Sequence, residues 1–163
     1  ACEAGAQAGL HIYCGLELRT TTSDNDYLLF GAAPELLYST PELHRYTIPQ
    51  LRALADREGL LLVQAHPFRT GLTREDPALL DGVEVFNGNA RHDSHNDDAL
   101  RFARENGLLF FSGSDHHETE DRGRGGMVLP REPKDETDLV RLLPSAGLLP
   151  DILLEFFPVK PEK

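Results

Sequence analysis

The segment LLFFSGSDHHETEDRGRGG, residues 108–126, places an apolar run directly before a cluster of Gly, Ser, Asp and His residues. The apolar part is expected to form a buried strand, and Asp115 and His117 follow the point where that strand ends. Carboxylates and imidazoles are costly to bury without a partner. The cluster therefore needs a partner, and the rest of the chain indicates what it is.

The surrounding sequence alternates between apolar runs and amphipathic segments. This order is typical of βα units in an α/β fold with parallel strands. Thr47 and Gly59 fit the first and last caps of one helix. The segment 151–157 fits either a strand or a helix. Strands are expected at 11–18, 26–31, 60–68, 82–87 and 108–115, and helices at 2–9, 47–59, 93–107 and 135–143.

Polar residues stand where four of these strands end. In parallel α/β folds the functional site lies at the C-terminal ends of the strands, so these side chains are expected to converge. Carboxylates and imidazoles without cysteine suit Zn, Mn or Fe. Two such ions could share a bridging carboxylate and hydrolyse a phosphate ester. The residues at the strand ends are Glu17, His66, Asn87 and Asp115.

Two further sets of residues complete the predicted site. Arg69 and Arg124 are predicted to grip a phosphate by bidentate hydrogen bonds, although a solvated surface arginine is an equal alternative for each. Glu84 lies in the middle of an expected strand and is predicted to support or pair with other groups rather than bind an ion.

Four motifs in this order resemble the PHP family, the polymerase and histidinol phosphatase domain. They are GLE (15–17), AHPFR (65–69), GVEVFNG (82–88) and GSDHH (113–117), and the resemblance covers most of residues 10–130. It implies a distorted (β/α)7 barrel, up to three divalent metal ions and hydrolysis of phosphate esters. It also implies roles by motif: Glu17 is the bridging ligand, His66 a metal-binding histidine, Asp115 a ligand of the first metal and His117 a ligand of the third.

The sequence departs from the family pattern at its beginning. The HxH strand and the TDH segment of the family have no match in the sixteen residues before Glu17. Asp26 stands where the family often has another histidine, and it is a weak substitute. We expect residues 1–163 to be one partial PHP-like domain that lacks its first βα units, so that the barrel is incomplete on its N-terminal side. A degenerate relative is the alternative to such a fragment.

Composition limits the class of partner. The formal net charge of −11 repels nucleic acid and anionic membranes. No apolar stretch approaches the ~18 residues of a membrane span, so a cytoplasmic protein is expected. Cys2 and Cys14 form no CxxC motif and are predicted to be reduced thiols, with a disulfide between them as the alternative.

These observations lead to two functional hypotheses. The first is a metal-dependent phosphoesterase for a phosphorylated small molecule or nucleotide, with weak or no activity in this chain alone. The second is a non-catalytic remnant that binds a metal or a ligand. An exposed strand edge is expected where strands are missing, and it could pair with a second copy of the chain or with the missing segment.

Overall fold

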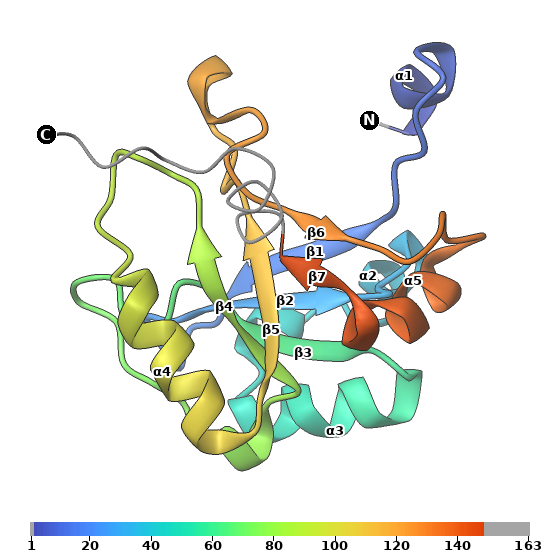
Figure 1. The fold of residues 1–163 in the computed structure, drawn as a ribbon. Helices are drawn as coiled ribbons and strands as arrows, with labels where there is room; N and C mark the ends of the chain where they lie inside the picture. Colours follow the sequence, from blue (N-terminus) through green and yellow to red (C-terminus); the bar gives the residue numbers. More distant parts are fainter. Residues whose placement is uncertain (1, 149–163) are drawn as a thin grey trace, which may run out of the picture.

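The computed structural model describes residues 2–148 and places a five-stranded sheet at the centre of the molecule (Figure 1). The strand order is β1-β2-β3-β4-β5, which follows the order of the strands in the sequence. The segment 151–157, for which the sequence allowed a strand or a helix, lies outside the described residues. The strands are β1 (Gly15–Arg19), β2 (Asp26–Phe30), β3 (Leu61–Gln64), β4 (Gly82–Asn87) and β5 (Leu109–Gly113).

The sheet is mixed and not wholly parallel. β2 runs antiparallel to both β1 and β3, whereas β3, β4 and β5 are parallel to one another. The expectation of parallel strands throughout was therefore wrong for β2. The connection between β1 and β2 is residues 20–25, and a parallel crossover needs about a dozen residues or more. The start of β2 consequently lies at the same end of the sheet as the C-terminal ends of the other four strands.

The sheet is open, and the predicted distorted (β/α)7 barrel, even an incomplete one, is wrong. A barrel closes only when each strand has a neighbour on both sides. Within residues 2–148, β1 pairs only with β2 and β5 pairs only with β4. The chain therefore forms a small α/β domain whose sheet has two edges, one at β1 and the other at β5.

Helices and a second small sheet cover the two faces of the central sheet (Figure 1). One apolar cluster joins β-strand residues to α3 and α4, and a second joins the opposite face to the segment 127–143. The described helices are α1 (Cys2–Gln7), α2 (Pro34–Ser39), α3 (Ile48–Glu58), α4 (Asn96–Asn106) and α5 (Glu136–Leu142), and the second sheet pairs β6 (Met127–Val128) with β7 (Gly147–Leu148).

The helix boundaries follow local signals in the sequence. Gln50 accepts a hydrogen bond from the Thr47 backbone N–H at 2.8 Å, which satisfies a donor at the start of α3. Gly59 and Gly107 end α3 and α4 in left-handed conformations, with φ of 68° and 65°. The helices expected at 47–59, 93–107 and 135–143 are confirmed within three residues at each end.

Strand alternation decides which side of the sheet carries the polar groups. Leu16 and Leu18 of β1 pack toward the cluster that contains α3, so Glu17 between them points to the opposite face. Leu28 of β2, the cross-strand partner of Glu17, packs on that opposite face. The second apolar cluster covers part of this face, and the polar site lies at the C-terminal ends of the strands.

Two other expectations concern the membrane and the thiols. Among the described residues no helix has both the length and the apolar content needed to span a membrane. Cys2 and Cys14 are free thiols with their sulfur atoms 3.9 Å apart.

Candidate metal centre

A small cavity lies where the strand ends meet. Its volume is about 160 Å³. Three of the four residues predicted as metal ligands contribute to its wall. The lining residues are Glu17, Leu28, Ala65, His66, Glu84, Asn87, Gly113 and Asp115.

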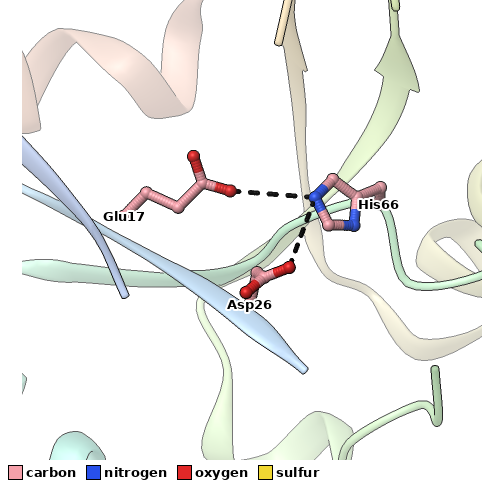
Figure 2. A group of neighbouring side chains, drawn as sticks. All are labelled: Glu17, Asp26 and His66. Carbon is pink, nitrogen blue, oxygen red and sulfur yellow. Dashed lines mark ion pairs between the residues drawn. The ribbon is translucent and has the colours of Figure 1, made fainter. Parts of the chain in front are cut away.

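Glu17, Asp26 and His66 bring three ligand atoms together beside this cavity (Figure 2). The His66 Nε2 atom lies 3.7 Å from Glu17 Oε1 and 3.8 Å from Asp26 Oδ2, and the three ligand atoms all lie within 4.8 Å of one another. Glu17 comes from β1, Asp26 is the first residue of β2, and His66 follows β3. These three residues could hold a metal ion.

The spacing of the three atoms fits an ion better than it fits direct hydrogen bonds. Both nitrogen–oxygen distances exceed the 3.2 Å that hydrogen bonds normally reach. Two ligands about 2.1 Å from one tetrahedral ion lie roughly 3.4 Å apart, so the two nitrogen–oxygen pairs are only a few tenths of an ångström wider than coordination requires. The other ring nitrogen, His66 Nδ1, is buried and has no hydrogen-bond partner among the described residues.

The backbone at His66 is held in an unusual conformation. His66 has a φ of 29°, and the residue is only 3% exposed. Asp115, which also lines the cavity, has a φ of 47°. Positive φ values are unfavourable for residues with a side chain and gather at functional sites. The backbone N–H of His66 donates a hydrogen bond to Glu84 Oε2 at 3.0 Å, which helps to hold the backbone in this conformation.

Glu84 is a buried carboxyl group directly behind this site. Burial raises its pKa to about 7, although hydrogen bonds from the Asn87 side chain and the His66 backbone partly oppose the rise. The Asn87 amide donates to both Glu84 and Asp115, at 3.0 and 3.2 Å. Asn87 thus connects the two carboxyl groups on the cavity wall.

This pKa leads to a prediction for Glu84→Gln in metal-free protein. The folded state retains the Glu84 proton up to about pH 7, whereas the unfolded chain loses it near the ordinary value of 4.5. The free energy of unfolding should therefore fall by about 2–3 kcal/mol between these pH values in the wild type. Glutamine has no proton that titrates in this range, so the variant should lose this decline. Its side-chain oxygen can still accept both hydrogen bonds, so the local structure should be kept.

Denaturant titrations from pH 5 to 8 with a chelator present would measure the difference. Glu105→Gln is the matched control, because Glu105 is exposed on α4. A Glu84→Gln variant with the same pH dependence of stability as the wild type would contradict the raised pKa of Glu84.

Asp115 forms an ion pair with the arginine that was predicted to hold phosphate. Arg69 Nη2 lies 2.7 Å from Asp115 Oδ2, and the Asp115 side chain is 8% exposed. Burial alone raises the pKa of Asp115, but hydrogen bonds from Arg69 and Asn87 outweigh it and hold that pKa below its ordinary value. Asn89 also donates to Asp115 Oδ2, at 3.4 Å. These contacts make Asp115 and Arg69 partners of each other.

The remaining predicted residues lie outside the cavity wall. The His117 side chain is 67% exposed, and its Nδ1 atom lies 3.0 Å from the Asp115 carbonyl oxygen. The Arg124 Nε atom donates to the Glu120 carbonyl at 2.8 Å, and the residue is exposed. The backbone here is tightly packed: a Cβ atom at Gly88 would lie 2.6 Å from the Arg124 carbonyl oxygen. The structure thus does not bring His117 or Arg124 to the three clustered ligand atoms.

Sequence reasoning underestimated Asp26 and missed Arg19. Arg19 holds Asp26 through two hydrogen bonds, from Nε to Oδ1 at 2.9 Å and from Nη2 to Oδ2 at 2.6 Å. The sequence did contain a pattern that predicts this contact. The short polar connection 20–25 is typical of a hairpin, and a hairpin places the end of one strand beside the start of the next.

Comparisons with known proteins agree with the fold and with part of the resemblance. A protein-family model described as PHP-associated matches residues 93–145, a span that begins before α4 and ends after α5 and is less than half of the chain. The match is to this PHP-associated domain and not to a full PHP domain. The predicted extent of the resemblance is thus supported in part, since 93–145 includes GSDHH and not the three earlier motifs.

One similar solved structure is that of PsfC from Pseudomonas syringae PB-5123. The two share a TM-score of 0.69 and 22% sequence identity, over 86% of this chain. The chain corresponds to 60% of the length of PsfC. This likeness concerns the fold. No curated protein sequence matches the chain.

Proposed function

We propose that Glu17, Asp26 and His66 bind a divalent metal ion, Zn, Mn or Fe, and that this site serves the hydrolysis of phosphate mono- or diesters. The observation that carries the proposal is the position of the His66 Nε2 atom between two carboxylates, at distances too long for hydrogen bonds. One nitrogen and two carboxylate oxygens form a donor set that suits these ions. The hydrolytic part rests on the resemblance to the PHP family, with which the PHP-associated match over 93–145 agrees.

The chain supplies three elements to such a reaction. Glu17 and Asp26 supply the negative charge that attracts a cation, and His66 supplies a buried imidazole. Asn87 and Glu84 hold the His66 backbone and the cavity wall in place. A bound divalent ion would supply Lewis acidity and would lower the pKa of a coordinated water. The substrate class is a phosphorylated small molecule or a nucleotide.

We expect the chain alone to turn over slowly. The described residues place three ligand atoms together, and Asp115, which was predicted to be a ligand of the first metal, is paired with Arg69. An ion with few protein ligands leaves the attacking group poorly positioned, and poor positioning can cost about 100-fold in rate. This occupation of Asp115 also favours the second candidate function, a domain that binds a metal without catalysis.

Metal content and turnover, measured on the same preparation, test the proposal. We expect about one Mn or Zn per chain after dialysis, determined by elemental analysis, and slow hydrolysis of a chromogenic phosphate ester that is lost in His66→Ala. Metal binding without turnover of any phosphomonoester or diester would select the non-catalytic function. A wild-type chain that retains no metal would refute the site itself.

A further inference from the structure

Arg19 stands beside the candidate metal centre and shares one of its ligand atoms. The Asp26 Oδ2 atom that lies 3.8 Å from His66 Nε2 also accepts a hydrogen bond from Arg19 Nη2 at 2.6 Å. Arg19 and Asp26 are direct cross-strand partners in the β1-β2 pair. Arg19 lies two residues after Glu17 and therefore on the same face of β1.

The two cations would compete for this oxygen. A divalent ion about 2.1 Å from Asp26 Oδ2 would lie roughly 4 Å from the Arg19 guanidinium. The repulsion between charges of +2 and +1 at that distance is about 2 kcal/mol even in water, and larger near a protein surface. Because the Arg19 side chain is 57% exposed, it can turn away without disturbing the apolar core.

The charges then favour an anion. Glu17 and Asp26 carry −2 and Arg19 carries +1, so a divalent ion brings these three side chains to +1, with Asp24 a further carboxylate near Arg19. A released guanidinium offers two parallel donors that match the oxygens of a phosphoryl group. The two arginines that the sequence predicted to hold phosphate have other partners. Arg69 pairs with Asp115, and Arg124 donates to a backbone carbonyl, so Arg19 and not these two pairs with a carboxylate of the cluster.

We propose that Arg19 is an exchangeable anion-binding residue, which releases Asp26 to the metal ion and then binds a phosphoryl oxygen of the ligand. This inference rests on the proposed function and deepens it, because it names the residue that recognises the phosphate. It requires that metal and phosphate bind with positive coupling, and that the coupling depends on Arg19.

The test is the affinity for Mn²⁺, followed by the electron paramagnetic resonance signal of free Mn²⁺, with and without inorganic phosphate. In the wild type we expect phosphate to tighten Mn²⁺ binding by about 5- to 10-fold. Arg19→Gln should bind Mn²⁺ at least as tightly as the wild type without phosphate, and phosphate should have no further effect. Arg19→Lys keeps the positive charge but loses the two parallel donors of the guanidinium, so it should retain a smaller coupling between Mn²⁺ and phosphate.

Arg45→Gln is the matched control, because Arg45 is also an exposed arginine paired with a carboxylate, but that carboxylate, Glu42, is not one of the three clustered residues. It should behave as the wild type does. Equal coupling in the wild type and in Arg19→Gln would overturn the inference, and so would weaker Mn²⁺ binding in Arg19→Gln with the coupling retained. A wild type that binds no Mn²⁺ would instead refute the metal site, and the inference with it.

Discussion

His66→Ala is expected to weaken the binding of Zn or Mn by at least about 100-fold. His66 supplies the sole nitrogen of the three clustered ligand atoms, and its side chain is 4% exposed. The variant leaves two carboxylates, of which Glu17 is half-exposed and free to move. Two carboxylates alone hold an ion less tightly than one buried imidazole and two carboxylates do. Isothermal titration calorimetry would measure the change in affinity.

Two comparisons keep this result interpretable. His44→Ala removes an exposed imidazole that does not line the cavity, and it should leave the affinity unchanged. His66→Gln fills most of the vacated space, so it separates loss of a ligand from loss of packing. Thermal melts with a chelator would show that each variant is folded. Tight metal binding by a folded His66→Ala protein would remove His66 from the site.

Arg69→Met should lower the free energy of unfolding by about 3–4 kcal/mol at neutral pH. The change leaves the Asp115 carboxylate without its ion pair, although that side chain is only 8% exposed. Asn87 and Asn89 would still donate to it, and the exposed His117 ring lies 3.2 Å from its Oδ1 atom, but no buried cation would replace the guanidinium. Denaturant titration would measure the loss. Arg124→Met is the control, because Arg124 is exposed and forms no such pair.

The pairing also predicts how this loss depends on pH. The folded-state pKa of Asp115 is lowered, so the stability that this carboxylate contributes is present above its ordinary value of 3.8 and is lost as the pH falls through the folded value. The difference between wild type and Arg69→Met should therefore shrink below about pH 4. The double variant Arg69→Met, Asp115→Asn should recover most of the loss at neutral pH. No recovery in the double variant would mean that Arg69 acts through packing alone.

Local signals were sufficient to predict most of the elements and part of the site. Thr47 and Gly59 mark the limits of α3, and Gly107 marks the end of α4. The rule that strand ends carry the site placed Glu17, His66 and Asp115 around one cavity. That rule depends only on the direction of the strands, and β1, β3, β4 and β5 do run in the same direction.

The errors came from pairings that local patterns do not contain. The resemblance suggested a barrel, but closure depends on a contact between the first and last strands, and no such pairing occurs in residues 2–148. The ion pair of Asp115 and Arg69 was not predicted, because the two residues are 46 positions apart in the sequence. Asp26 was undervalued because it begins its strand, whereas the rule considers residues that end one.

The edge position of β1 also bears on how fast the site would fill and empty. Glu17 stands on a strand with no neighbour on its outer side among the described residues, and half of its side chain reaches solvent. Exposed side chains change rotamer within picoseconds to nanoseconds, far faster than a fold opens. The Glu17 carboxylate can therefore approach and leave the ion without any opening of the fold, so exchange of the ion would not require the chain to unfold.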